Sequence, residues 1–398
     1  MDSQIEMVGM DPRIGFYNIM IGEVLNNQYI VLRQLGSGLY SSVWLARDLS
    51  DLSYKAVKVL SAECYDGTKD LFEKEILNHL RDKDPSHPGY KHISILRDSF
   101  VLLGPYGRHV CLVFDPMGET LASFGTLFIG CRIPGRIVQR FTKQLLLALD
   151  YAHASRVIHT DPYLDIHQGN IMIKIRDYSV IDEYMDKTAN DTGIFDPIKP
   201  GVQCHWAPRD FGVTDMLELE TLDIALCDWG TASWVHNHLS EIIQPVLLRS
   251  PEVLLGAPWG PVVDIWNLGA VLFEVLEAGR LCNGEEEVTD FKYSVKNHLA
   301  QMEALFGYFP GYLLACGYPP LIYQCFDKHG QIGRPIQGKL ESRLRSLCGD
   351  DKAKFISMFR SMMTIDPACR KSAHDLLITE PWLRDRRMSL WGLEGRYV

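Results

Sequence analysis

Two short stretches of this chain place acidic and amide side chains directly after apolar runs. Residues 157–173 begin Val-Ile-His-Thr-Asp and end Gly-Asn-Ile-Met-Ile, and residues 224–230 read Ile-Ala-Leu-Cys-Asp-Trp-Gly. Such runs predict short buried strands with oxygen ligands at their ends. That arrangement is typical of a site that handles phosphate and a divalent cation. The first stretch carries two aspartates, Asp161 and Asp165, where such a site has room for one.

The composition fits a large globular chain. Its 398 residues are 46% hydrophobic and 23% charged, and its ten cysteines are scattered without a C-x-x-C pair. We therefore expect free thiols in a reducing compartment. No signal sequence or apolar run of about 18–20 residues is present, which predicts an intracellular, cytoplasmic protein without a membrane span, with the nucleus left open as a second location. The net charge of −10 argues against direct nucleic-acid binding and suits a basic partner, although solubility alone would also explain it.

The order of elements predicts an α+β, bilobal fold. After a leader (1–28), a small β-rich N-lobe covers 29–115 and a large helical C-lobe covers 116–385, followed by a tail (386–398). The polar residues 176–221 lack a sustained period, so we expect a surface insert there. The expected strands are 29–35, 42–47, 54–60, 93–103 and 109–114, and the expected helices include 69–81 and 135–154.

A glycine-rich turn and a lysine in an apolar strand suggest contacts with phosphate groups. Gly36 and Gly38 let backbone N–H groups approach an anion, with Ser41 where a third glycine often stands. Taken alone, this pattern is more often a simple turn. Lys58 lies within Ala-Val-Lys-Val, where an unpaired ammonium would be costly unless it snorkels to water. A carboxylate on the next helix would pair with it; we predict Glu75, which precedes Ile-Leu, with Glu73 as the alternative.

The motifs resemble, in content and order, those of a eukaryotic protein kinase. The resemblance covers about residues 22–385. It rests on the glycine-rich loop, the lysine strand, the helix glutamate, the two opening stretches, Arg-Ser-Pro-Glu at 249–252, Asp-Ile-Trp at 264–266 and Asp-Pro-Ala-Cys-Arg at 366–370. It implies that Asp264 braces the catalytic loop and that Arg370 pairs with Glu252.

Finer features resemble the SR-protein kinases, in the form common in filamentous fungi. They are Ile-Gly-Glu at 21–23, His-Thr-Asp at 159–161, the segments 232–238 and 244–252, and the insert between the two opening stretches. The resemblance implies phosphorylation of serine or threonine in basic Arg/Ser-rich proteins and a part in regulating mRNA splicing. It also implies a monomeric enzyme.

Two Asp-x-Gly sequences compete for the role of metal-binding motif. Asp210 begins a literal Asp-Phe-Gly, but the residues before it are polar and broken by proline. Asp228 follows the apolar run 224–227, which supplies the strand that such a ligand needs, and lies 24 residues before Glu252. We therefore predict Asp228 as the metal ligand.

The catalytic loop is longer than the kinase pattern by four residues. That pattern puts the base aspartate two residues after the histidine and five before the metal-binding asparagine. Counting forward from His159 gives Asp161 as the base, whereas counting back from Asn170 gives Asp165. Because base and metal ligand must face the same phosphate, we favour Asp165 and keep Asp161 as the alternative. His167, where kinases usually carry a lysine, should be mostly neutral at pH 7.

The resemblance implies ATP and Mg²⁺ as cofactors. Gly36, Gly38 and Lys58 would contact the phosphates, and Asn170 and Asp228 would hold magnesium. The adenine would lie against Val43 and Ala56 and bond to the hinge between Asp115 and Met117, with Phe114 as gatekeeper.

The acidic residues 285–287 and Asp290 lie where related kinases place a docking groove, or they form a solvated loop. Besides an active kinase, two alternatives stay open. The chain could be a pseudokinase or ATP-binding scaffold disabled by the loop insertion, or the insertion could reflect a misplaced splice junction.

Thr160 predicts kinase activity that does not depend on phosphorylation of the activation loop. It replaces the arginine that, in many kinases, needs a phosphorylated activation loop for neutralisation. Kinase activity should therefore survive phosphatase treatment of the purified protein. Loss of peptide phosphorylation after that treatment would contradict the prediction.

Overall fold

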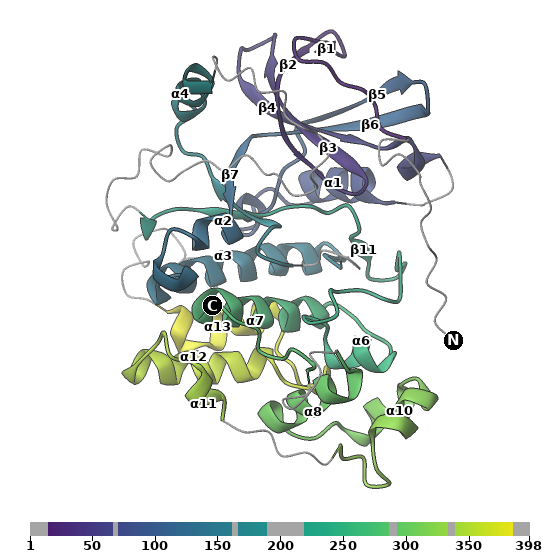
Figure 1. The fold of residues 1–398 in the computed structure, drawn as a ribbon, viewed down its shortest axis with the longest axis vertical. Helices are drawn as coiled ribbons and strands as arrows, with labels where there is room; N and C mark the ends of the chain where they lie inside the picture. The colour runs from purple at the N-terminus through teal and green to yellow at the C-terminus, as the bar shows by residue number, and fades with distance from the viewer. Residues whose placement is uncertain are drawn as a thin grey trace.

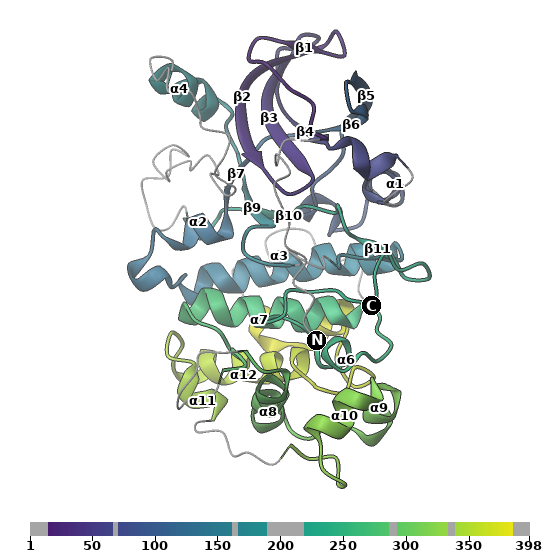
Figure 2. The ribbon, with the colours of Figure 1, turned by 45° about the vertical axis from the view of Figure 1, so that its right-hand side comes forward.

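The computed structural model describes residues 15–66, 71–160, 166–188, 219–285, 293–332 and 339–384. They form a small sheet-rich lobe above a larger helical lobe (Figures 1 and 2). The bilobal α+β fold expected from the sequence is confirmed.

The N-lobe is a six-stranded antiparallel sheet in the order β1-β2-β3-β4-β6-β5. Strands β2, β3, β4 and β6 lie close to the predicted ranges, whereas β5 begins later because 93–97 is extended chain with a single bridge to the C-lobe. The strands are β1 (Val24–Leu25), β2 (Tyr29–Ser37), β3 (Ser41–Asp48), β4 (Tyr54–Leu60), β5 (Asp98–Gly104) and β6 (Gly107–Phe114). Helix α1 (Glu73–Asp82) covers the face toward the cleft and buries Ile76, Leu77 and Leu80.

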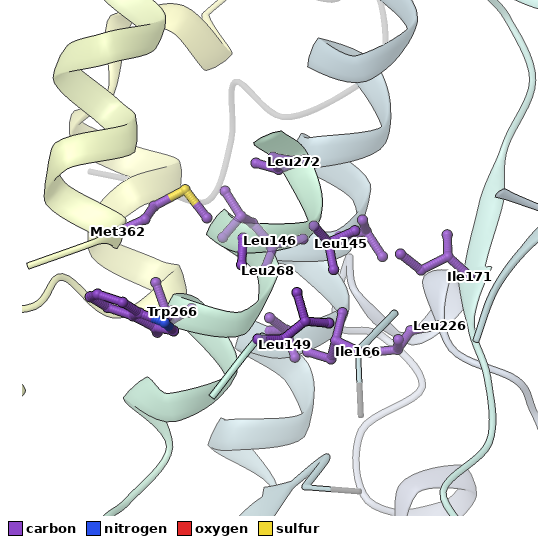
Figure 3. Packing of buried hydrophobic residues seen from close by; sticks show 14 of the residues in the cluster. Leu145, Leu146, Leu149, Ile166, Ile171, Leu226, Trp266, Leu268, Leu272 and Met362 are labelled. Carbon is purple, nitrogen blue, oxygen red and sulfur yellow. The ribbon is translucent and has the colours of Figure 1, made fainter. Parts of the chain in front are cut away.

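Two helices form the centre of the C-lobe. α3 (Gly135–Ala154) has the bounds that its apolar period predicts, and α7 (Val262–Glu277) is buried almost all round, as expected for a central helix. Leu145, Leu146 and Leu149 of α3 pack with Leu268 of α7 (Figure 3). On the other side of α3, Ile166, Ile171 and Leu226 continue the core toward the cleft. The cleft floor is therefore rigidly joined to both central helices.

Short strands and further helices complete the lobe. The cleft floor is a three-stranded sheet, β10-β9-β7, and β8 pairs with β11. These strands are β7 (Met117–Thr120), β8 (Val157–Ile158), β9 (Ile171–Lys174), β10 (Ile224–Leu226) and β11 (Ser233–Trp234). The remaining α-helices are α2 (Leu121–Gly125), α4 (Ser179–Thr188), α6 (Pro251–Leu255), α8 (Val295–Phe306), α9 (Gly311–Cys316), α10 (Pro319–Cys325), α11 (Leu340–Arg343), α12 (Gly349–Met362) and α13 (Ala373–Thr379).

The insert departs from the sequence expectation. Its first part forms helix α4, which lies beside the N-lobe although its chain comes from the C-lobe strand β9 (Figures 1 and 2). Val180 and Ile181 are buried against Leu45 and Tyr54 of the sheet. The Tyr54 hydroxyl donates to Asp182 Oδ1 at 2.5 Å, and the Arg33 guanidinium lies 5.0 Å from the Tyr184 ring centre. Residues 189–218 lie outside the described part of the chain.

Other expectations concern thiols and membrane spans. The nine cysteines in the described ranges are free thiols, and burial raises the pKa of Cys111, Cys227 and Cys282 to about 12. Cys204 lies outside those ranges. Within the same ranges, the structure has no helix with the length and apolarity to span a bilayer.

A buried ion pair joins α6 to the segment before α13. Arg370 Nη1 donates to Glu252 Oε1 at 2.7 Å and Nη2 to Oε2 at 2.9 Å, with both side chains 0% exposed. The pairing implied by the kinase resemblance is confirmed. Arg370 also donates to the Val262 carbonyl at the start of α7. Removing one partner would leave the other charge buried and uncompensated.

Because the pair is buried, substitutions of Arg370 and Glu252 should have strongly non-additive effects on the free energy of unfolding. Arg370→Met and Glu252→Met should each lower the free energy of unfolding by about 3–5 kcal/mol, and the double variant should lose much less than their sum. Denaturant unfolding of the four proteins measures this cycle. Lys354→Met, which breaks the exposed pair with Asp350, is the control and should cost under about 1 kcal/mol. Additive losses would contradict the assignment.

Candidate active site

The glycine-rich hairpin joins β2 to β3 above the cleft. Gly36 pairs with Val43, and the Gly38 N–H donates to the Ser41 carbonyl at 2.8 Å. Neither glycine has a positive φ, and a Cβ added at Gly36 would meet no atom within 4 Å. Neither backbone conformation nor internal packing therefore requires glycine at position 36. The open space beside it fits a phosphate group close to the backbone.

Lys58 joins three elements of the cleft. It lies on β4, paired with Val43 of β3 and Leu112 of β6. Its Nζ donates to Glu73 Oε1 of α1 at 2.6 Å and to Asp228 Oδ1, beyond β10, at 2.8 Å. Burial alone would lower the pKa of Lys58, but attraction to both carboxylates raises it instead. Burial would likewise raise the pKa of Asp228, but Lys58 outweighs it and the pKa is lowered. Lys58 and Asp228 are therefore both charged at neutral pH.

The predicted partner of Lys58, Glu75, is wrong. Glu75 accepts a hydrogen bond from the Tyr65 hydroxyl at 3.2 Å, whereas Glu73 is 2% exposed and binds Lys58. Glu73 shares a helix face with Ile76, Leu77 and Leu80, which lie three, four and seven residues later. Two residues from Glu73 is a turn of about 200°, so Glu75 lies on the opposite face. The helical period of the buried leucines was the sequence signal that identifies Glu73.

Asp228 occupies a special backbone position. Its φ is 59°, and the following Trp229 side chain is fully buried with its ring centre 4.8 Å from that of His159. The His159 ring bonds through Nε2 to the Cys227 carbonyl at 3.0 Å, and the His159 N–H donates to Asp264 Oδ2 at 3.0 Å. Asp264 therefore braces the start of the catalytic loop, as the resemblance implied. The competing Asp210 lies outside the described residues.

Asn170 and Asp228 come from the same edge of the cleft-floor sheet. β9 and β10 are antiparallel with Ile171 opposite Leu226, and the Cys227 N–H donates to the Asn170 carbonyl at 2.8 Å. An amide and a carboxylate beside a paired lysine are oxygen ligands suited to Mg²⁺ bound to a nucleotide. The described residues therefore fit Mg²⁺ and ATP. Asp161 and Asp165, the two candidate bases, lie outside the described residues.

His167 is buried beside the loop. Its Nδ1 accepts a hydrogen bond from the Gly169 N–H at 2.8 Å, which leaves the proton on Nε2. Burial lowers the pKa of His167 to about 4, so the ring is neutral at pH 7. Nε2 has no hydrogen-bond partner among the described residues. The ring can therefore donate one neutral hydrogen bond where kinases usually present a lysine charge.

Thr160 occupies a fully buried position with neutral partners. Its hydroxyl donates to Ser233 Oγ at 3.1 Å and lies 3.3 Å from the Thr231 carbonyl. Ser233 Oγ in turn accepts from the Leu239 N–H. The activation segment is therefore joined to the catalytic loop by hydroxyl hydrogen bonds, which need no phosphate to neutralise them.

The predicted nucleotide pocket has apolar walls and a fixed hinge. Ala56 lies opposite Phe114 across β4 and β6, and Val43 is half-buried on β3. The Asp115 side chain is held by Lys55 at 3.4 Å and by Arg97 at 2.5 Å. This pair of cations, which the sequence reasoning missed, keeps the Asp115 carboxylate occupied. The backbone of Asp115 would then make the contact with an adenine ring. The hinge then enters β7 at Met117, paired with Lys174 of β9.

Comparison with known proteins gives the family. The protein kinase domain model matches residues 29–192 and 209–383. The chain belongs to the protein kinase family. A serine/threonine protein kinase of Aspergillus fumigatus is 31% identical over 92% of this chain and 87% of that protein. Serine/threonine-protein kinase SRPK of Physarum polycephalum is 30% identical over 83% and 78%. Protein kinase dsk1 of Schizosaccharomyces pombe is 28% identical over 93% and 83%.

The fold comparison agrees. A crystal structure of a kinase domain has a TM-score of 0.66 at 20% identity, covering 94% of this chain and 100% of that one. Within the family, this chain is a serine/threonine protein kinase that resembles the SR-protein kinases.

The two glutamates of α1 give a matched test of the site. Glu73→Gln should lower kcat/KM for peptide phosphorylation by about 10²-fold, because Lys58 loses a buried anionic partner. Glu75→Gln, on the same helix but bonded to Tyr65 rather than to Lys58, should stay within about twofold of wild type. Steady-state kinetics with Mg-ATP distinguish the two. Equal losses in both variants would contradict the assignment of Glu73.

Proposed function

We propose that the protein transfers the γ-phosphoryl group of Mg-ATP to serine or threonine hydroxyls in basic, Arg/Ser-rich proteins. The observation that carries this proposal is the complete Lys58–Glu73–Asp228 arrangement beside a braced His159. The net charge of −10 favours association with basic chains. A monomeric enzyme in the cytoplasm, with the nucleus as a second location and regulation of splicing as its role, belongs to the same proposal.

Each residue would have a distinct part in the transfer. The backbone at Gly36 and Gly38 and the Lys58 ammonium hold the phosphates, and Asp228 and Asn170 hold Mg²⁺, which offsets the charge that develops on the phosphoryl oxygens. Asp165 accepts the proton of the attacking hydroxyl. The new oxygen–phosphorus bond forms as the bond to the ADP oxygen breaks. His167 orients the phosphoryl group by one neutral hydrogen bond.

The alternative of a pseudokinase or scaffold has less support. A chain released from catalysis has no need to keep a lysine in a buried strand with two carboxylates around it, because that arrangement carries a desolvation cost. We favour Asp165 over Asp161 as the base because Asp165 lies five residues before Asn170, the spacing of the kinase pattern. The Asn170 carbonyl accepts from the Cys227 N–H, which places Asn170 at the cleft floor next to the segment that carries Asp228.

The deciding experiment compares wild type with Asp165→Asn, Asp161→Asn and a deletion of residues 161–164, using Mg-ATP and an Arg-Ser repeat peptide. Asp165→Asn should lower kcat by about 10²–10⁴-fold, while Asp161→Asn should retain most activity. Loss of activity in Asp161→Asn alone would transfer the role of base to Asp161. An inactive wild type beside an active deletion variant would overturn the proposal of an active enzyme.

A further inference from the structure

The last turn of α1 is hydrogen-bonded to the C-lobe through the His79 side chain. His79 Nε2 lies 2.9 Å from the carbonyl of Ser155, the residue that caps the end of α3. Because a carbonyl only accepts, Nε2 carries the proton and donates. The end of a helix carries partial negative charge, which favours a donor there. His79 lies six residues beyond Glu73, about 9 Å along the helix axis, so this bond fixes the far end of the helix that pairs with Lys58.

A tryptophan of the activation segment holds the His79 ring. The ring centres of His79 and Trp234 are 5.1 Å apart and their planes meet at 75°, the edge-to-face arrangement that aromatic rings favour. Trp234 belongs to β11, where it lies opposite Val157 of β8, and its side chain packs against the main hydrophobic core. β11 lies beside the end of α3, below α1 (Figure 2). The Trp234 ring therefore has a fixed place in the C-lobe, and it orients the imidazole toward Ser155.

The other residue of β11 is bonded to the catalytic loop. Ser233 is 0% exposed, and its hydroxyl oxygen accepts from the Thr160 hydroxyl at 3.1 Å. Successive side chains of a strand point to opposite sides, so Ser233 and Trp234 reach different elements. This two-residue strand thus joins α1 to the loop that begins at His159. Both contacts are made by uncharged side chains of the activation segment.

We propose that Trp234 is a positioning residue for phosphoryl transfer, which acts through His79 to keep α1 where Glu73 binds Lys58. The proposal deepens the proposed function and rests on it. Without the Trp234 ring, the imidazole is free to turn away from the end of α3, and α1 loses a bond to the C-lobe. Each tilt or rotation of α1 then separates Glu73 from Lys58 and leaves the ammonium with Asp228 alone of its two carboxylates. Because Trp234 acts through Glu73, its contribution should vanish in a variant whose Glu73 is uncharged.

The kinetic test measures kcat/KM for peptide phosphorylation with Mg-ATP in two backgrounds. In the wild-type background, Trp234→Ala should lower kcat/KM about three- to tenfold, the factor expected for loss of one aromatic pair. Trp234→Phe, which keeps an aromatic ring, should stay within about twofold of wild type. In the Glu73→Gln background, Trp234→Ala should cost less than about a further twofold. An equal loss in both backgrounds, or no loss in the wild-type background, would overturn the proposal.

A matched control lies elsewhere in the N-lobe. Tyr17 and His109 form a similar edge-to-face pair, with ring centres 5.5 Å apart and planes at 73°. Tyr17 packs against a separate cluster of the sheet that includes Phe100 and Val113. Tyr17→Leu removes this pair and should leave kcat/KM within about twofold of wild type. A loss in Tyr17→Leu equal to that in Trp234→Ala would mean a general weakening of the N-lobe and would also overturn the proposal.

Amide hydrogen exchange separates this proposal from the proposed function, because it needs no chemistry. Exchange of residues 77–82 in the nucleotide-free protein reports how often the end of α1 opens. Trp234→Ala and His79→Ala should each speed it about three- to tenfold, and the double variant should exchange no faster than His79→Ala.

Each outcome of the exchange measurement has a separate meaning. An inactive wild type whose variants show these shifts would refute the kinase function and keep the positioning contact. Unchanged exchange in both single variants of an active enzyme would refute the positioning contact alone. If Trp234→Ala does not fold, His79→Ala takes its place in both the kinetic and the exchange test, with the same expected results.

Discussion

The paired ammonium of Lys58 is the interaction on which the rest of the cleft depends. Lys58 lies on β4, which pairs with a strand on each side, and its buried ammonium group would be unfavourable without anionic partners. Glu73 comes from α1, in the N-lobe, and Asp228 comes from the end of β10, in the C-lobe. The two contacts therefore fix α1 against the sheet and the lobes against each other. Lobe opening or rotation of α1 would break one of them and leave a charge poorly compensated.

Helix α7 has a comparable role below the cleft. It is buried almost all round, and it meets the catalytic loop through Asp264 near its start and Glu274 near its end. The Arg370–Glu252 pair lies at its first turn, because Arg370 also bonds the Val262 carbonyl. The loop geometry thus derives from a helix whose own position is set by core packing. This arrangement explains how residues distant in sequence act at one site.

Helix α4 adds a contact between the lobes that is separate from the hinge. It leaves the C-lobe at β9 and buries Ile181 against Leu45 and Tyr54 of the N-lobe sheet. The polar composition of the insert hid this role, because a short apolar stripe is enough for a helix to pack against an existing surface. In α4 that stripe is Val180, Ile181, Tyr184 and Met185. A helix of ten residues is marginal alone in water and is stabilised here by that packing.

The sequence by itself determined the fold class and the central helices, because these depend on local period and motif order. It also predicted Lys58 and Asp228 as site residues, and the structure brings these two into contact. Asp228 was separable from Asp210 by the strand that precedes it, and the spacing from Asn170 favoured Asp165 over Asp161 as the base. Only the tertiary structure decided the rest. It showed that Lys58 binds Glu73 and not Glu75, and burial in the folded chain lowers the pKa of His167 to about 4, further than a histidine in solution would have it. It also placed Glu274 beside Gln168 of the catalytic loop. The spacing of residues along one sequence does not show which side chains meet across the fold.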